Sequence, residues 1–259
     1  FHNKTLYIFL PHQDDEIGIW PIWEHILKAS NIYIFCVTNG EQKLGQLHKT
    51  RNIRNIRNIE LLKNLTTNGI KKENIFFISD NLPPTDQLSY EYACEILAKI
   101  SALVDRITAP DIILTTASEG GHPDHDVTNF LVRVFSKKLP NKPLAFEFFW
   151  YSISRRFLPF NFGKPEKITA DLIAVPFSRL AIIKTIKAIL IYRSQRQTFF
   201  LLGPFFVARL LLQPKVFLRK LDLNNTSFEL PPNSAILYEW RGWIKFSEIK
   251  RKLNKIGLI

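Results

Sequence analysis

The stretch "TLYIFLPHQDDEIG", residues 5–18, joins a continuous apolar run to a group of ionisable side chains. The run at 5–10 does not alternate in polarity, which is typical of a strand buried on both faces of a sheet. Four ionisable residues follow it closely: His12, Asp14, Asp15 and Glu16. So much charge at the exit of a buried strand indicates a binding or catalytic site at that edge of the sheet.

Similar apolar runs alternate with longer segments of helical period. The expected strands are residues 5–10, 32–37, 74–79, 111–116 and 144–150. The expected helices are residues 17–30, 49–69, 89–107 and 125–138. This order predicts an α/β fold with a Rossmann-like, doubly wound, mostly parallel sheet and helices on both faces.

The pattern is less regular in the last third of the chain. We expect a loop at 155–165, a strand at 167–175 and helices over 178–196. Residues 1–196 are therefore expected to form the main domain, and residues 197–259 a less regular C-terminal extension packed on the same domain.

Length and composition favour a cytoplasmic protein with a large core. The chain has 259 residues, of which 46% are hydrophobic. Cys36 and Cys94 lie inside apolar patterns, so we expect two core residues and no disulfide. The short N-terminal apolar run has no basic segment before it, unlike a secretory signal. Peripheral association with a membrane is left open, as is the oligomeric state.

The net charge of +12 is unevenly distributed. No acidic residue stands between Asp171 and Asp222, whereas nine basic residues do: Arg179, Lys184, Lys187, Arg193, Arg196, Arg209, Lys215, Arg219 and Lys220. About 12 uncharged residues precede Arg209, fewer than the roughly 20 that a spanning helix needs. The region therefore favours an anionic membrane surface over a transmembrane helix. No nucleic-acid-binding module is recognisable, so nucleic acid is not the expected partner.

A second polar group, "EGGHPDHD" at 119–126, follows the strand expected at 111–116. If this strand and the strand at 5–10 are neighbours at the switch point of the sheet, four side chains converge: His12, Asp15, His122 and His125. Two imidazoles and one carboxylate, with a position left for water, form the ligand set of a catalytic Zn²⁺ site, and Fe²⁺ accepts the same set. Three crowded carboxylates repel one another, so at least one is expected outside the metal's ligands and free to act as a base.

The two motifs resemble the paired signature of the LmbE-like, or PIG-L, family of zinc-dependent N-acetylglucosamine deacetylases. "PHQDDE" at 11–16 is similar to the family's AHPDDE, and "GGHPDH" at 120–125 to its later HPDH. The resemblance continues in "TNG" at 38–40, in Arg57 with Glu60, and in "KAILIYRSQ" at 187–195, and covers roughly residues 5–196. Pro11 and Gln13 depart from the usual motif.

The resemblance implies roles for these residues. His12, Asp15 and His125 would bind the metal, and Asp14 would be the general base. A protonated His122, oriented by Asp124, would support the oxyanion. The implied reaction removes the acetyl group from an N-acetylated amino sugar and gives a free amine and acetate.

Three further residues are candidates for binding the substrate: Arg57, Asp80 and Gln13. We expect Arg51 and Arg54 on the solvated face of a helix whose Ile53, Ile56 and Ile59 turn inward, and Arg57 could lie on that face instead of at the site. Asp80 could reach a sugar hydroxyl or serve as a turn residue. Gln13 could present its amide to the substrate or alter the turn. Glu16 could interact favourably with the positive end of the dipole of the first helix, or it could form a hydrogen bond that supports a metal ligand.

Two other functions remain open on the sequence alone. One is an anionic-surface or nucleic-acid-binding protein with a non-catalytic metal site. The other is a metal-dependent hydrolase of a different amide or ester. The basic, apolar region at 179–221 favours a sugar that is lipid-linked or phosphate-linked.

Overall fold

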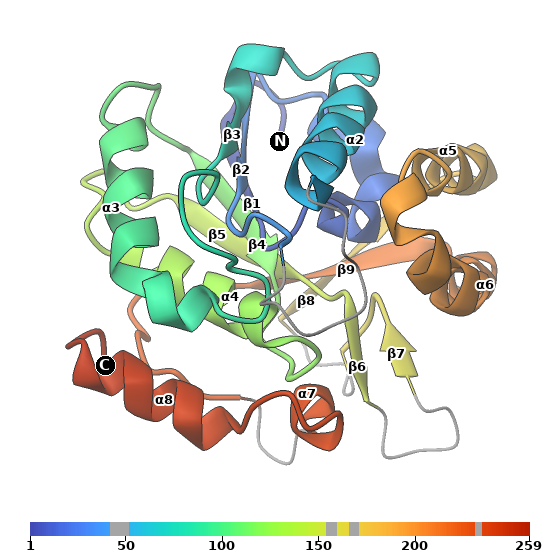
Figure 1. Ribbon diagram of the computed structural model, residues 1–259. Coiled ribbons are helices and arrows are strands. Elements are labelled where there is room, and N and C mark those ends of the chain that lie inside the picture. Colours follow the sequence, from blue (N-terminus) through green and yellow to red (C-terminus); the bar gives the residue numbers. More distant parts are fainter. Residues whose placement is uncertain (42–51, 154–159, 166–170, 231–234) are drawn as a thin grey trace.

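The computed structural model describes residues 1–41, 52–153, 160–165, 171–230 and 235–259. Its centre is a seven-stranded sheet of order β3-β2-β1-β4-β5-β9-β8 (Figure 1). The strands are β1 (Thr5–Leu10), β2 (Asn31–Cys36), β3 (Ile75–Phe77), β4 (Ile112–Thr116), β5 (Leu144–Phe148), β8 (Leu172–Pro176) and β9 (Lys215–Lys220). The first five are parallel, and β9 runs antiparallel to both β5 and β8. The prediction of a mostly parallel α/β sheet is confirmed.

The strand order reverses beside β1. Ile8 of β1 pairs with Ile34 of β2 on one side and with Leu114 of β4 on the other. The chain continues outward from β1 to β2 and β3, then returns across the sheet to β4. The expected neighbours at the switch point are therefore neighbours, and the two polar motifs leave the sheet at the same edge.

Helices cover both faces of the sheet (Figure 1). They are α1 (Trp23–Ile26), α2 (Ile53–Thr67), α3 (Ala93–Val104), α4 (Pro123–Ser136), α5 (Arg179–Ile189), α6 (Arg196–Leu212), α7 (Leu237–Trp240) and α8 (Phe246–Lys255). In β1, Leu6, Ile8 and Leu10 pack in the core with α2, α5 and α6, whereas Tyr7 and Phe9 pack with α3, α4 and α8. All five are fully buried, and burial of each such side chain contributes about 1.5–3 kcal/mol.

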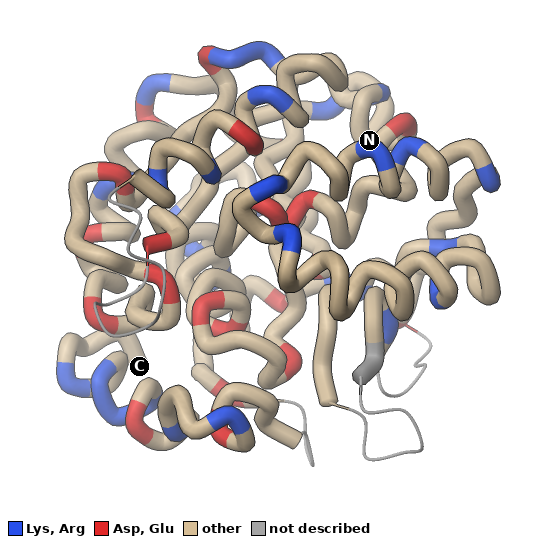
Figure 2. Tube along the Cα trace, turned by 45° about the vertical axis from the view of Figure 1, so that its right-hand side comes forward, with Lys and Arg blue, Asp and Glu red and all other residues tan. Residues whose placement is uncertain are grey.

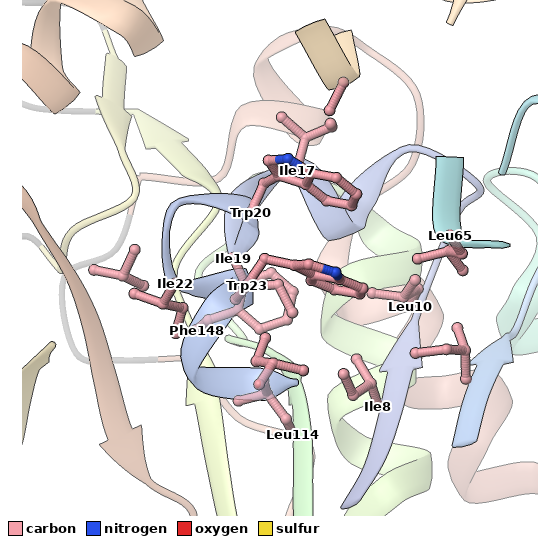
Figure 3. Packing of buried hydrophobic residues seen from close by; sticks show 14 of the residues in the cluster. Ile8, Leu10, Ile17, Ile19, Trp20, Ile22, Trp23, Leu65, Leu114 and Phe148 are labelled. Carbon is pink, nitrogen blue, oxygen red and sulfur yellow. The ribbon is translucent and has the colours of Figure 1, made fainter. Parts of the chain in front are cut away.

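The first crossover is not the helix expected at 17–30. Two 3-10 helices, η1 (Asp15–Gly18) and η2 (Trp20–Ile22), precede the single turn of α1. Pro21 lies within η2 and has no N–H for a longer helical hydrogen-bond ladder. The segment instead packs its side chains compactly: Trp20 stacks on Trp23 with ring centroids 4.6 Å apart, beside Phe148 (Figure 3).

The "RNIRNIRNI" repeat does not turn its isoleucines inward as expected. Ile56 and Ile59 are exposed on α2, whereas Arg57 is buried. A repeat of three residues drifts around a helix of 3.6 residues per turn, so successive members of the repeat face different sides. Arg51 lies outside the described residues.

The C-terminal third contributes to the main sheet. β9 belongs to the expected extension at 197–259, yet it lies between β5 and β8. Within the expected loop at 155–165, residues 160–162 instead form strand β7 (Phe160–Phe162), paired with β6 (Tyr151–Ile153); residues 154–159 are not described. The domain boundary at residue 196 stays a prediction. Cys36 is buried as expected, but Cys94 is exposed on α3.

We predict that Gly121→Ala strongly destabilises the protein. A Cβ atom at position 121 would overlap the backbone carbonyl oxygen of Tyr151, which cannot move without displacing β6. The free energy of unfolding should fall by about 3 kcal/mol or more in denaturant titrations. Gly203→Ala on α6 is the control, because no heavy atom lies within 4 Å of its added Cβ and alanine favours a helix by up to about 1 kcal/mol. Equal stability of the two variants would contradict the prediction.

Candidate active site

His12 and Asp15 form a closed turn at the carboxyl end of β1. The Asp15 Oδ2 atom accepts a hydrogen bond from the His12 backbone N–H, at 2.8 Å, and lies 3.0 Å from His12 Nδ1. Both side chains are buried. Because Asp15 follows His12 by three residues, its carboxylate orients the His12 imidazole from within the same turn.

The second motif begins α4 and meets this turn. His122 is the N-cap residue of α4, and its Nδ1 accepts a hydrogen bond from the Asp124 backbone N–H at 3.2 Å. One turn later, His125 Nε2 lies 3.2 Å from Asp15 Oδ1. The three imidazole ring centroids lie 4.6 Å (His12–His122), 5.5 Å (His12–His125) and 5.4 Å (His122–His125) apart. The expected convergence of the two motifs is present in the structure.

Asp124 contacts His12 more closely than it contacts His122. Its Oδ2 atom lies 3.0 Å from His12 Nε2 but 3.8 Å from His122 Nδ1. The backbone N–H groups of Gln87 and Ser89 also donate to this carboxylate. Burial alone would raise the pKa of Asp124. Interactions that stabilise its carboxylate, of which the hydrogen bond with His12 is the largest, lower this pKa to about 2. Asp124 thus orients His122 through its backbone N–H.

The charge states of the histidines differ because their neighbours differ. Burial alone would lower the pKa of His12, but the adjacent carboxylates, first that of Asp15, hold this pKa well above its usual value. Burial also lowers the pKa of His122, and the charge of His12 lowers it further. This direction and the hydrogen bond at Nδ1 favour a neutral His122, and its protonated form stays a prediction. Since its Nδ1 accepts a hydrogen bond, the ring proton lies on Nε2.

Asp86 is a member of the site that the sequence did not reveal. It is buried in the segment after β3, and its Oδ1 atom lies 3.7 Å from His12 Nε2 and 3.8 Å from His122 Nε2. In the sequence, Asp86 differs from other residues only in following the third expected strand. In that segment the sequence indicated Asp80 as the substrate-binding residue. Asp80 instead accepts a hydrogen bond from Asn58 of α2.

Arg57 and Asp14 form an ion pair beside the histidines. Arg57 Nη2 donates to Asp14 Oδ1 at 2.9 Å, while Nη1 donates to the carbonyl oxygen of Gly40 at 3.1 Å and lies 3.5 Å from Asp86. Arg57 is buried, so of its two proposed placements the structure has the one at the site. Asp14 is partly accessible to solvent. Gly40 has φ +64°, and a Cβ there would crowd the guanidinium.

Gln13 and Glu16 hold the surrounding elements together. Gln13 is fully buried, and its Nε2 donates to Asn58 Oδ1 at 2.9 Å. Glu16 accepts hydrogen bonds from Asn64 of α2, at 2.8 Å, and from the hydroxyl of Tyr192. Burial raises the pKa of Glu16 to about 8.

The segment at 187–195 reaches α2 at a second point. Ser194 donates hydrogen bonds to the Glu60 carboxylate from its backbone N–H, at 3.0 Å, and from its hydroxyl, at 2.5 Å. Two features noted in the sequence, the Arg57 and Glu60 pair and "KAILIYRSQ", are thus joined in the fold behind the site.

Two aromatic residues contact the histidines from the later part of the chain. Tyr151 of β6 lies edge-on to His125 with ring centroids 5.5 Å apart, and Trp243, between α7 and α8, lies 5.3 Å from His122 in the same manner. The guanidinium of Arg241 lies 4.9 Å from the centroid of the Trp243 ring. Trp243 had no sequence signal, because no local pattern relates residues 197–259 to the motifs.

The donor atoms are suitable for a divalent metal. Nitrogen atoms of His12, His122 and His125 lie within 4.8 Å of one another, and so do donor atoms of His12, Asp86, His122 and Asp124. Among the described residues, His125 Nδ1 and Asp86 Oδ1 are buried with no hydrogen-bond partner. A bound metal ion would give both atoms a partner. Asp15 touches His12 and His125 without belonging to either group.

A family sequence model described as "PIG-L: GlcNAc-PI de-N-acetylase" matches residues 7–136, about half of the chain. The chain belongs to the PIG-L family. The match includes both motifs of the candidate site. Comparison with curated protein sequences gives no match.

Solved structures share the fold of this PIG-L protein at low sequence identity. A triple mutant of a deacetylase from the teicoplanin biosynthetic pathway is 15% identical, with a TM-score of 0.59 over 83% of this chain and 97% of that one. The N,N'-diacetylchitobiose deacetylase of Pyrococcus horikoshii is 18% identical, with a TM-score of 0.58 over 89% and 88%. The zinc-inhibited form of teicoplanin deacetylase Orf2 is 13% identical, with a TM-score of 0.54 over 84% and 99%.

We predict that Glu16→Gln makes stability less dependent on pH. The folded pKa of about 8 exceeds the usual 4.5, so between these values the folded chain holds a proton that the unfolded chain has released. Stability from this group is therefore fully present below pH 4.5 and is lost as the pH rises toward 8. Glutamine keeps an oxygen for Tyr192 and Asn64 but cannot ionise. Thermal unfolding should show the variant gaining on the wild type between pH 5 and pH 8.5, and a constant difference would contradict the raised pKa.

Proposed function

We propose that this PIG-L protein is a metal-dependent N-deacetylase. Its substrate would be an N-acetylglucosamine-type amino sugar, and its products a free amine and acetate. The observation that carries the proposal is the meeting of the two motifs, where three buried histidines, with unpaired donor atoms on His125 and Asp86, lie beside the Asp14–Arg57 pair. Membership of the PIG-L family, and a fold shared with two deacetylases, support it.

Zn²⁺ fits the donor set, and Fe²⁺ would accept the same atoms. We propose His12, Asp15 and His125 as the ligands. In such a site the metal supplies a polarised amide carbonyl and a water whose pKa is near neutrality. Binding of the metal would also neutralise the charge of the crowded carboxylates. Burial of these charges without a metal costs free energy.

Asp14 is the proposed general base. Its carboxylate is partly accessible, so a substrate can approach it. The ion pair with Arg57 fixes its orientation. Asp14 would accept a proton from the attacking water and return it to the nitrogen as the C–N bond breaks.

His122 is the proposed donor to the carbonyl oxygen. A neutral ring with its proton on Nε2 can donate a hydrogen bond to the negative charge that develops there, without first being protonated. The backbone N–H of Asp124 holds the ring in this tautomer. The aromatic faces of Tyr151 and Trp243 provide apolar surface for a sugar ring beside the reacting group.

We predict that Asp14→Asn lowers turnover without loss of metal. Asparagine keeps the size and one oxygen for Arg57 but cannot accept the proton, so kcat should fall by about 10² to 10⁴. Acetate release from N-acetylglucosamine substrates, free, nucleotide-linked and lipid-linked, would be measured with the metal-loaded protein. Asp105→Asn, at the end of α3, is the control and should keep wild-type turnover. Nearly full activity in the Asp14 variant would remove Asp14 from the mechanism, and no acetate release from any substrate by the wild type would refute the proposed activity.

We predict that Asp15→Ala loses bound metal. The variant lacks the carboxylate that contacts both His12 and His125, so the Zn²⁺ content after dialysis should fall well below that of the wild type. His122→Ala separates the roles, because it should lose turnover while it keeps the metal. Wild-type metal content in Asp15→Ala would exclude Asp15 as an essential ligand, and metal loss in His122→Ala would assign His122 to the ligand set.

A further inference from the structure

Helices α5 and α6 expose an unusual amount of apolar surface. Nine of the sixteen exposed large apolar side chains in the described parts of the chain lie on these helices or at their ends. They are Leu180, Ile183, Ile186, Leu190, Phe200, Leu201, Phe205, Leu211 and Leu212. We call this set the α5–α6 face. Exposed apolar side chains gathered on two helices that contact each other indicate an interaction site.

The α6 helix is apolar on two opposite sides. Phe206 and Leu210 are buried against the body, and the ring centroid of Phe206 lies 4.9 Å from that of Trp150. At 100° per residue, the five exposed residues from Phe200 to Leu212 form one stripe on the other side. The most exposed, Phe200 and Leu212, are each 82% accessible. A helix that is apolar all round is normally covered all round, so a second surface is needed.

Basic residues accompany this stripe without acidic ones. Arg179, Lys184 and Lys187 belong to α5, Arg193 lies just before α6, and Arg196 is the first residue of α6. No Asp or Glu occurs from residue 172 to 221. Lys184 pairs with Glu24 of the neighbouring segment. In Figure 2, which brings this side of the molecule forward, the pair of helices is mostly tan with blue positions.

We infer that the α5–α6 face docks on an anionic phospholipid membrane. Apolar side chains would enter the interface while Lys and Arg bind lipid phosphates, the combination by which helices lie on membranes. No described helix is long and apolar enough to cross a bilayer, so docking is peripheral. A second copy of the chain fits this face less well than a membrane does. Twofold packing would bring the basic residues of the two copies together, and like charges repel.

The face is joined to the wall of the candidate active site. Its α6 helix packs through Phe206 on Trp150, and Arg209 Nη2 donates to the carbonyl oxygen of Gly163, next to β7, at 2.7 Å. The next residue after Trp150 is Tyr151, which contacts His125. The inference itself rests on the exposed surface and its charge, and does not require the proposed activity.

Leu201→Asp tests the inference with a matched control, Ile59→Asp. Both residues are exposed on long helices, Leu201 at 65% and Ile59 at 63%, but Ile59 lies on α2, outside the face. The full chain would be floated with vesicles of phosphatidylcholine alone or mixed with phosphatidylglycerol. We expect the wild type and Ile59→Asp to bind the mixed vesicles, with Leu201→Asp binding at least tenfold more weakly. Arg196→Glu should weaken binding about fivefold or more, and only to the anionic vesicles.

Several results would overturn the inference. They are failure of the wild type to bind anionic vesicles, equal binding to neutral vesicles, or an equal loss in Ile59→Asp. A stable dimer in light scattering that Leu201→Asp dissociates, without vesicle binding, would assign the face to a second copy. Hydrolysis of a water-soluble N-acetylglucosamine substrate, measured in parallel, should be the same in Leu201→Asp and wild type. That assay distinguishes failure of docking from failure of the proposed activity.

Discussion

The imidazole of His12 is buried between two carboxylates, and the rest of the site depends on this arrangement. Asp15 lies 3.0 Å from one ring nitrogen and Asp124 lies 3.0 Å from the other. An isolated charge in such a place costs several kcal/mol or more, so each of these groups is tolerable only because the others are present. The two carboxylates come from opposite sides of the switch point, which makes the pairing of β1 with β4 a condition for the site.

Residues farther from His12 hold the reactive groups in place through hydrogen bonds and an ion pair. Arg57 fixes Asp14, and it is fixed in turn by the carbonyl oxygen of Gly40. Tyr192 and Asn64 hold Glu16, and Ser194 holds Glu60, so that α2 is tied to the segment between α5 and α6. The bonds of Glu16 and Glu60 lie behind the candidate site, where burial favours uncharged or paired groups. A site of this kind can keep its geometry while its outer loops determine which molecule enters.

The α5–α6 face and the candidate site share structural elements. Trp150 packs on α6, and its neighbour Tyr151 contacts His125. A membrane bound to α6 would therefore lie beside strands β6 and β7, which carry Tyr151 and adjoin the site. Helix α3 lies on the other side of the sheet, away from such a membrane (Figure 1). The basic and apolar composition of this region is visible in the sequence, but a composition does not specify which residues face outward.

The sequence by itself determined the parallel sheet, its switch point and the meeting of the two motifs. Continuous apolar runs mark buried strands, and polar residues at their carboxyl ends are brought together by the topology that those runs imply. Only the tertiary structure decided that Arg57 faces the site, that Asp86 and Trp243 contact the histidines, and that Phe200 to Leu212 form an exposed stripe. The reason is physical. Local periodicity shows which residues are apolar and how often they recur, whereas the partner of each helix face is set by packing between segments that can lie more than a hundred residues apart.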